Sequence, residues 1–273
     1  MMNMKRIAIL NDIHGNYLFL ERILRDLKYQ NIDEYIIGGD LVSDGFENEL
    51  VVNKVKELTS NVILGNRDED IVNYDLKSWK ENDRFENMLY AFKQLSKSSF
   101  DFLKKLPKYK IINIENKRIC ISHGSPYNIK DAIRPYNMEL FDKLIKDFDC
   151  DIYLFAHTHQ QFDITYKNRY FINSGAINCS SCGQPGSYYG ILTIENDNIS
   201  YEQRVYEFDF EEVKKYYLES DYYQECQEWA NLVLYTLKTG EDKCCPFIDS
   251  YDNNLSYNAN FIKYMKDNDL KIL

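Results

Sequence analysis

The first part of the chain alternates short apolar runs with amphipathic segments. Residues 7–10 predict a buried strand, and apolar residues from Leu20 to Leu27 then recur at the spacing of one helical face. Residues 35–37 and 62–64 predict two further strands, separated by a second helical pattern. Such alternation of strands and helices is typical of neighbouring parallel strands with helices packed on the sheet.

The middle of the chain is rich in strands. After a helical segment over residues 83–106, residues 110–114 and 118–122 predict a hairpin around a polar connection. A helix over residues 138–148 follows. Further strands are predicted over residues 152–155, 162–166, 169–172, 188–194 and 199–206. These strands indicate a second, mixed sheet.

The pattern changes near residue 208, where Glu, Lys and Tyr recur at helical spacing without a strand signal. We therefore divide the chain into a domain over residues 1–207 and an acidic, Tyr-rich helical extension over residues 208–273, packed on the domain. The alternative roles for this extension are a cap over the functional site or a dimer surface. Neither an internal repeat nor a low-complexity linker is evident in the sequence.

Composition and charge narrow the class of partner. The chain has 273 residues and a net charge of −10, most of it in the extension, which disfavours binding to nucleic acid or to an anionic membrane. The sequence has no apolar run of the ~18 residues that a membrane-spanning helix needs and no signal-peptide pattern, so a cytoplasmic protein is expected. The 7 cysteines are scattered and odd in number, which favours reduced thiols. We interpret the closely spaced Cys179 and Cys182 as ordinary loop residues.

Polar side chains collect directly after five of the apolar strands. They are Asp12, His14, Asp40, Asn66, His123, His157 and His159, and they include all 4 histidines of the chain. Because the carboxyl ends of strands in layered α/β folds border one crevice, we expect these side chains to meet there. Mixed nitrogen and oxygen ligands without thiolate suit Mn²⁺, Fe²⁺, Zn²⁺, Co²⁺ or Ni²⁺. If one aspartate bridges, the set divides into two metal sites that could clamp both oxygens of a displacement at phosphorus.

Five short motifs, in a fixed order along the chain, carry a family resemblance. They are Asp12-Ile13-His14-Gly15-Asn16, Gly39-Asp40, Gly65-Asn66-Arg67-Asp68, His123-Gly124 and His157-Thr158-His159. Together they resemble the calcineurin-like metallophosphoesterase superfamily, and within it the compact bacterial phosphodiesterase-like members. The resemblance implies an α/β fold of two mixed β-sheets packed as a sandwich with helices on the outer faces, to which the mainly helical extension is added.

The resemblance also implies a role for each residue of the set. Asp12, His14 and His159 would hold one divalent ion, Asn66, His123 and His157 would hold the other, and Asp40 would bridge them. Two Mn²⁺ ions are expected, with Fe, Zn, Co and Ni as alternatives. An ion-bound hydroxide would be the nucleophile, because coordination lowers the pKa of water from ~15.7 toward ~7. Asn16 would support the ligands from behind.

Arg67 departs from the superfamily pattern, since many relatives have a histidine there that contacts the phosphate and can protonate the leaving group. A guanidinium stays protonated near neutral pH, so it donates hydrogen bonds and charge but no proton. With Asn66 and Asp68, Arg67 is a candidate catalytic residue, and we expect it to hold phosphoryl oxygens. Turnover should then favour esters with acidic leaving groups, such as aryl phosphodiesters. The alternative is a surface arginine paired with Asp68 or Glu69.

Other positions affect the loops around the site. Asn11 stands where serine is common, and Ala156 stands where glycine usually precedes the His-x-His pair, so a positive φ there would strain the loop. Residues 173–176 are similar to the Asn-Pro-Gly-Ser turn of the superfamily. Tyr127 and Tyr136 are either stacking surfaces for a substrate or packing residues, and packing is the favoured interpretation.

These observations favour a phosphoesterase with a dinuclear metal site that hydrolyses a small phosphodiester, in preference to a phosphomonoester. Two divalent ions would leave a positively charged pit on an acidic protein, which attracts a small phosphate ester more than a long polyanion. Specificity would come from loops over residues 44–49, 68–83 and 127–136, with the acidic extension as a further candidate. The alternatives are a non-catalytic scaffold of the same fold and, less favoured, a nuclease. No nucleic-acid or membrane partner is expected, and a homo-oligomer formed through the extension is an alternative.

Overall fold

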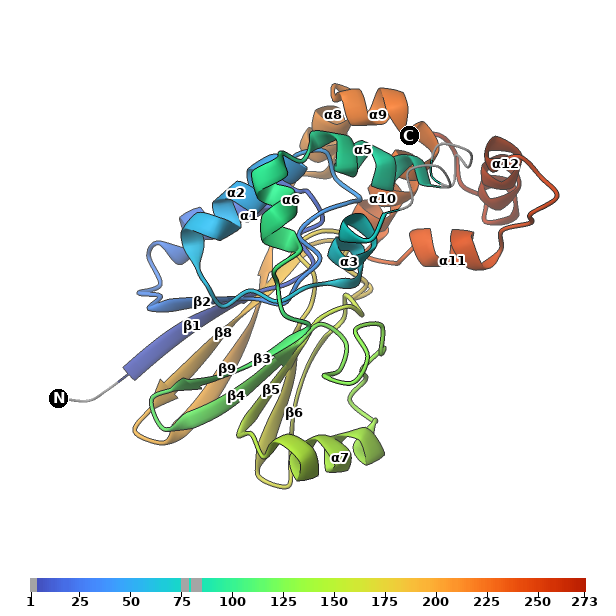
Figure 1. Cartoon of the computed structure of the whole chain (residues 1–273). Coiled ribbons are helices and arrows are strands. Elements are labelled where there is room, and N and C mark those ends of the chain that lie inside the picture. Colours follow the sequence, from blue (N-terminus) through green and yellow to red (C-terminus); the bar gives the residue numbers. More distant parts are fainter. Residues whose placement is uncertain (1–3, 75–78, 80–84) are drawn as a thin grey trace.

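Two mixed β-sheets form the centre of the molecule in the computed structural model, which describes residues 4–74, 79 and 85–273 (Figure 1). The first sheet has the strand order β2-β1-β8-β9. Its strands are β1 (Met4–Leu10), β2 (Glu34–Ile37), β8 (Ser187–Glu195) and β9 (Asn198–Tyr206). β1 pairs in parallel with β2 and antiparallel with β8, so the N-terminal strand lies beside a strand from far along the chain.

The second sheet has the strand order β3-β4-β5-β7-β6. Its strands are β3 (Tyr109–Ile114), β4 (Lys117–Ser122), β5 (Ile152–Phe155), β6 (Gln161–Tyr166) and β7 (Arg169–Ser174). β4, β5 and β7 run parallel to one another, and the antiparallel strands β3 and β6 form the two edges. The carboxyl ends of the three parallel strands therefore lie at the same edge of the sheet.

Alternating side chains on the strands separate an inner core from two outer ones. Ile7 of β1 and Leu154 of β5 belong to the apolar cluster shared by the two sheets. Their neighbours Ala8 and Phe155 belong to clusters on the outer faces, because successive side chains of a strand point to opposite sides. This is the sandwich that the resemblance implies, so the predicted fold class is confirmed.

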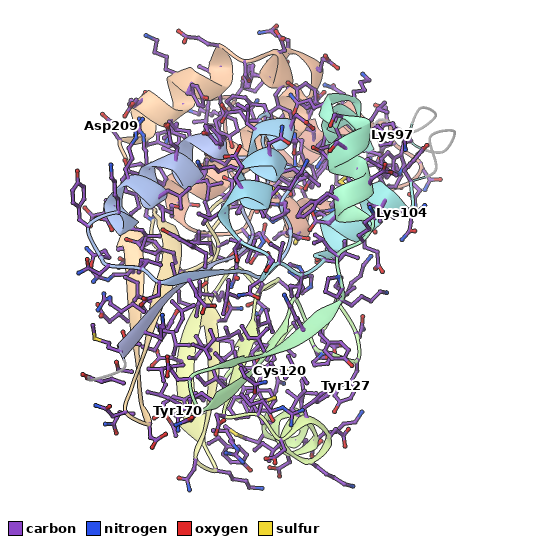
Figure 2. The ribbon with its side chains drawn as sticks, turned by 60° about the vertical axis from the view of Figure 1, so that its left-hand side comes forward. Lys97, Lys104, Cys120, Tyr127, Tyr170 and Asp209 are labelled. Atoms are coloured by element: carbon purple, nitrogen blue, oxygen red, sulfur yellow. The ribbon has the colours of Figure 1, made fainter. Side chains whose placement is uncertain are left out.

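Helices cover both outer faces of the sandwich. The helical layer over the first sheet contains α1 (Tyr17–Leu27), α2 (Asn48–Leu58), α3 (Asn66–Val72), α5 (Glu86–Gln94) and α6 (Lys97–Leu103). α7 (Met138–Phe148) covers the second sheet, where Phe141 stacks on Phe171 with ring centroids 4.1 Å apart. Figure 2 shows the labelled Cys120 close to α7, in agreement with its place in the same buried cluster.

The helical extension packs on the first helical layer. Its helices are α8 (Phe210–Leu218), α9 (Asp221–Glu225), α10 (Gln227–Thr239), α11 (Cys244–Asp249) and α12 (Tyr257–Asp267). Trp229 and Phe247 share one buried cluster with Phe19 and Val51, so the extension buries its apolar side chains against the domain. The boundary at residue 207 stays a prediction. Within the described residues, every helix is too short or too polar to span a bilayer.

Four predicted elements differ from the observed ones. Residues 62–64 contribute only an isolated parallel bridge to Ile37, because the chain turns there into the loop before α3. The helix predicted over residues 83–106 is interrupted, because Ser96 caps the start of α6, and its first residues lie outside the described part. β8 and β9 belong to the first sheet and not to the second, since strand periodicity does not identify the pairing partner.

Candidate metal centre

Loops that follow the strands bring the predicted ligands to one end of the sandwich. Asp12 and His14 follow β1, Asp40 follows β2, and His157 and His159 follow β5. All five residues have a positive φ, between 48° and 65°. Since each such conformation costs a non-glycine residue about 1–3 kcal/mol, the surrounding contacts must hold these loops in place. Clusters of strained residues of this kind are typical of functional sites.

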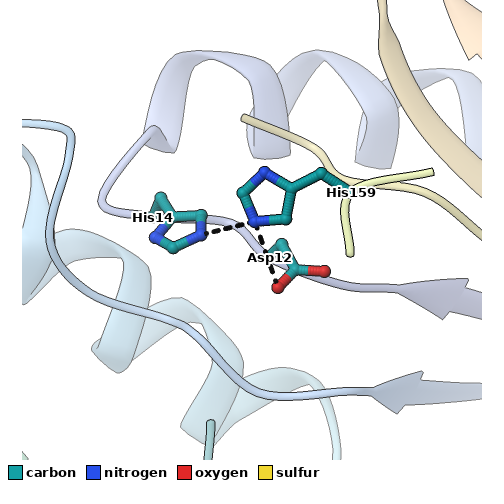
Figure 3. A group of neighbouring side chains, drawn as sticks. All are labelled: Asp12, His14 and His159. Atoms are coloured by element: carbon teal, nitrogen blue, oxygen red, sulfur yellow. Dashed lines mark hydrogen bonds and ion pairs between the residues drawn. The ribbon is translucent and has the colours of Figure 1, made fainter. Parts of the chain in front are cut away.

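Asp12, His14 and His159 form the first group of neighbouring side chains (Figure 3). His14 Nε2 and His159 Nε2 lie 3.1 Å apart, and His159 Nε2 lies 3.5 Å from Asp12 Oδ1. One ligand atom from each of the three residues lies within 4.8 Å of the others. The loops after β1 and β5 therefore bring together the three residues that the resemblance assigns to one ion.

A second group shares Asp12 with the first and adds Asp40 and His123, again with ligand atoms within 4.8 Å of one another. His123 Nε2 lies 3.4 Å from Asp40 Oδ2 and 2.9 Å from Asn66 Oδ1. The ring centroid of His157 lies 5.1 Å from that of His123. All seven predicted ligands are thus neighbours, and Asp12 takes part in both groups. Which residue serves which ion stays a prediction.

The other ring nitrogen of three histidines is held by an oxygen acceptor. The pairs are His14 Nδ1 with Asp44 Oδ2 at 3.1 Å, His123 Nδ1 with Gly38 O at 2.8 Å, and His159 Nδ1 with Cys179 O at 2.7 Å. A carbonyl oxygen or a carboxylate can only accept, so each Nδ1 carries the proton and donates it. In the neutral rings, the Nε2 lone pairs therefore face the cluster, which is the orientation that a metal ligand needs.

The carboxylates make the centre of the cluster attractive to positive charge. Burial lowers the pKa of His159, but the charge of Asp12 raises it by a larger amount, to about 9. Burial also lowers the pKa of His123, and Asp40 raises it to about 9. Burial and the charge on His123 lower the pKa of His157 to about 4, so that this imidazole is neutral at physiological pH. A cation at the centre would be stabilised by the same charges.

The surroundings of the Asp12 carboxylate indicate whether the cluster suits a metal ion. Both of its oxygens are buried, and neither has a hydrogen-bond donor among the described residues. A buried carboxylate without donors costs several kcal/mol unless a cation compensates its charge. His159 Nε2 and His123 Nε2 approach Asp12 Oδ1 to 3.5 and 4.0 Å. Oxygen and imidazole ligands in this proportion suit a divalent transition-metal ion, so the residues fit a metal.

Arg67 lines the cavity over this cluster. Its backbone N–H donates to Asp40 Oδ1 at 2.7 Å, and its guanidinium Nε lies 3.8 Å from Asp44 Oδ2. The predicted alternative, a surface arginine paired with Asp68 or Glu69, does not describe this arrangement, because the guanidinium pairs with Asp44. Arg67 is therefore placed where it could contact a bound anion.

Asp68 has a different position from Arg67. It is fully buried, and its carboxylate accepts from the backbone N–H groups of Leu41 at 2.9 Å and Gly65 at 3.0 Å. These bonds tie the start of α3 to the loop that carries Asp40. Burial and the charge of Asp40 raise the pKa of Asp68 to about 7. The catalytic role predicted for Asp68, Asn66 and Arg67 stays a prediction.

Asparagines fix the loops that carry the ligands. Asn11 Nδ2 donates to Phe155 O at 3.0 Å and to Ser174 Oγ at 2.9 Å, which joins the two sheets directly beneath the cluster. Asn16 caps α1 and donates to Asn178 Oδ1 at 3.2 Å. Asn178 Nδ2 in turn donates to His14 O at 3.3 Å, so Asn16 reaches the His14 loop through Asn178, and its role behind the ligands stays a prediction.

The turn over residues 173–176 supports the second histidine loop. Asn173 Nδ2 donates to Ala156 O at 2.8 Å, directly before His157. Ala156 itself does not have a positive φ; the positive values fall on His157 and His159. An alanine is therefore tolerated at this position without the strain considered above.

A cavity of about 280 Å³ opens over the cluster, and its wall includes residues outside the predicted ligand set. These are Asp44, Ala132, Arg134, Cys179, Ser181, Asp242, Cys244 and Cys245. Asp44, Ala132 and Arg134 lie in two of the loops named above as candidates for specificity. The last three come from the extension and carry no local signal, because only the tertiary fold brings them to the cavity.

All seven cysteines are free, as expected for reduced thiols.

Arg134 and Tyr127 come from the segment between β4 and α7. Arg134 lines the cavity, and its Nη1 is buried without a hydrogen-bond partner among the described residues. Tyr127 instead packs on α7, where its hydroxyl donates to Asp147 Oδ2 at 2.7 Å and Lys143 Nζ lies 3.7 Å from its ring centroid (Figure 2). Tyr127 is thus a packing residue, whereas Tyr136 is 72% exposed.

Comparison with known proteins identifies the family. The model of the calcineurin-like phosphoesterase family matches residues 5–161, which is more than half of the chain. The chain belongs to this family. All seven candidate ligands lie within the matched residues, and the calcineurin-like phosphoesterases are metal-dependent, in agreement with the chemistry of the cluster.

Proteins similar to this calcineurin-like phosphoesterase match most of its length, in sequence or in fold. An uncharacterized protein of Methanocaldococcus jannaschii is 24% identical over 195 residues, which cover 66% of this chain and 76% of the relative. The crystal structure of a metallophosphoesterase from Sphaerobacter thermophilus matches with a TM-score of 0.69 and 22% identity, covering 86% of this chain and 99% of the other. A hypothetical protein of Pyrococcus horikoshii matches with a TM-score of 0.66 and 19% identity, covering 86% and 98%. Coverage of 86% is more than residues 1–207 can supply, so the similarity in fold reaches into the extension.

Proposed function

We propose that this protein hydrolyses a small phosphate ester, a phosphodiester in preference to a phosphomonoester, with two divalent metal ions. Mn²⁺ is the ion we expect first. The observation that carries the proposal is the buried Asp12 carboxylate, which lacks hydrogen-bond donors and faces the Nε2 atoms of His123 and His159. A cytoplasmic location and a small-molecule partner belong to the same proposal.

The ligand sets follow the resemblance. Asp12, His14 and His159 would hold one ion, Asn66, His123 and His157 the other, and Asp40 would bridge them. When bound, the ions supply Lewis acidity toward phosphoryl oxygens and lower the pKa of water.

The surrounding residues would bind and orient the ester. Arg67 and Arg134 line the cavity as permanent cations, and each can donate to non-bridging phosphoryl oxygens. The Arg67 backbone N–H also holds Asp40 Oδ1 in place. Neither arginine can protonate a leaving group, so that proton would come from water. A cavity of about 280 Å³ lies just below the usual range for ligand pockets, which supports a small substrate.

Metal removal tests this proposal. Protein stripped with a chelator should hydrolyse an aryl phosphodiester such as bis(p-nitrophenyl) phosphate only after Mn²⁺ is restored, and elemental analysis should find two ions per chain. The Asp40→Asn variant should lose activity and keep its circular dichroism spectrum. A fully active Asp40→Asn variant would contradict the bridging role, and lack of turnover with Mn²⁺, Fe²⁺, Zn²⁺, Co²⁺ and Ni²⁺ alike would favour the scaffold alternative.

A further inference from the structure

Asp44 connects the metal cluster to the extension. Its Oδ2 accepts from His14 Nδ1 at 3.1 Å and from Ser43 Oγ at 2.9 Å. Its Oδ1 accepts from Trp229 Nε1 and from Asn87 Nδ2, each at 2.7 Å. The two oxygens of one carboxylate thus face in different directions, one toward a candidate ligand and one toward helices α10 and α5.

The hydrogen bond between Trp229 and Asp44 satisfies a buried donor. Trp229 is 2% exposed and lies in the first turn of α10, within the apolar cluster that joins the extension to the domain. An indole N–H can only donate, so it needs an acceptor when it is buried, and Asp44 is that acceptor. The docked extension, together with Asn87 of α5, therefore holds the Asp44 carboxylate in place.

The orientation of Asp44 matters because it fixes the tautomer of His14. With Asp44 Oδ2 accepting from Nδ1, the lone pair on His14 Nε2 faces His159 Nε2, 3.1 Å away. Partners of this kind behind a metal ligand typically change metal affinity about 10–100-fold when they are removed.

We propose that Trp229 is a positioning residue for the metal cluster, because the docked extension holds Asp44 in the orientation that keeps His14 ready to bind an ion. This inference rests on the metal site of the proposed function. It gives the extension a role in metal binding that neither a cap nor a dimer surface would require.

Metal affinity of the full chain provides the test. Trp229→Phe removes the indole N–H and keeps an aromatic ring in the apolar cluster. Calorimetric titration with Mn²⁺ should show about tenfold weaker binding at one site, at the lower end of the effect expected for such partners. With Co²⁺ as the probe, the visible absorption spectrum should change, because it reports on the ligands of the ion.

The matched control is Tyr235→Phe, which removes a hydroxyl from the same helix without touching Asp44. The Tyr235 hydroxyl hydrogen-bonds instead to the backbone of Lys271. This variant should bind Mn²⁺ as the wild type does. If Tyr235→Phe weakens binding as much as Trp229→Phe, the effect is a general loosening of the extension and the positioning role is wrong.

A double-variant cycle separates positioning from packing. Asp44→Asn presents an amide that cannot accept from His14 Nδ1 while also accepting from Trp229, and should weaken Mn²⁺ binding about 100-fold. If Trp229 acts through Asp44, adding Trp229→Phe to Asp44→Asn should cause no further loss. Additive losses, or wild-type affinity in Trp229→Phe, would overturn the proposal.

Two further outcomes are informative. If Trp229→Phe does not fold, Asn87→Leu removes the other donor to the same Asp44 oxygen from outside the extension and should weaken Mn²⁺ binding in the same way; unchanged affinity would contradict the proposal. A wild type that binds Mn²⁺ but hydrolyses no ester would overturn the proposed function alone, whereas a wild type that binds no divalent ion would overturn both.

Discussion

Arg67 combines a position on the cavity wall with a side chain that cannot act as an acid. Without a protein group to protonate the leaving oxygen, the rate of hydrolysis should rise as the leaving group becomes more acidic. The measurement is kcat for a series of aryl phosphodiesters with different phenol pKa values. Replacing Arg67 with histidine should flatten this dependence, because an imidazolium can donate a proton. A flat dependence in the wild type would show that another group supplies the proton.

Arg134 should contribute mainly to binding of the ester. Its buried Nη1 has no acceptor among the described residues, so a substrate oxygen could accept from it. Because a hydrogen bond to a charged group contributes about 1.5–3 kcal/mol, Arg134→Gln should raise KM about tenfold or more and change kcat less. Lys130→Gln is the matched control, since Lys130 lies in the same loop but forms an exposed ion pair with Asp70. Equal effects of the two substitutions would assign the loss to general charge and not to the cavity.

At the level of elements, the loop after β2 packs closely against the loop before α3. A Cβ on Gly39, which has a φ of +91°, would lie 2.5 Å from the backbone nitrogen of Gly65. Gly39→Ala should therefore lower the free energy of unfolding by about 3 kcal/mol, from conformational strain and overpacking together. Denaturant unfolding measures the change.

The control for this substitution is Gly183→Ala. Gly183 has a similar φ of +76°, but a Cβ there would meet nothing within 4 Å. This variant should lose only the conformational part, about 1 kcal/mol. If both variants lose the same amount, the close packing of Gly39 on Gly65 contributes nothing to stability.

At the scale of the whole molecule, domain and extension share one apolar cluster, so they should unfold together. Because the chain has only two tryptophans, Trp79→Phe leaves Trp229 as the single fluorescent reporter of the extension. Fluorescence and far-UV circular dichroism should then follow the same denaturant transition. A fluorescence transition at lower denaturant concentration would show that residues 208–273 unfold separately. The predicted boundary at residue 207 would then separate two independently unfolding units.

Much of this architecture could be predicted from local patterns. The polar residues after β1, β2, β4 and β5 were recognisable because each follows a buried strand whose end is fixed by the sandwich. The pairing of β8 with β1 could not be recognised, because the alternation of apolar and polar residues identifies the faces of a strand and not its neighbour. Trp229 could not be connected to Asp44, since their contact depends on how α10 packs on the domain. Patterns thus predicted the ligands of the cluster but not the residues that hold those ligands in place.

The presence of every histidine of the chain in one cluster has a practical consequence for spectroscopy. In a heteronuclear NMR spectrum of the untagged protein, each imidazole signal reports on this cluster without any background from the rest of the chain. A titration with diamagnetic Zn²⁺ would then follow the filling of each position through the ring nitrogen shifts. The same spectra would identify which nitrogen of each ring carries the proton.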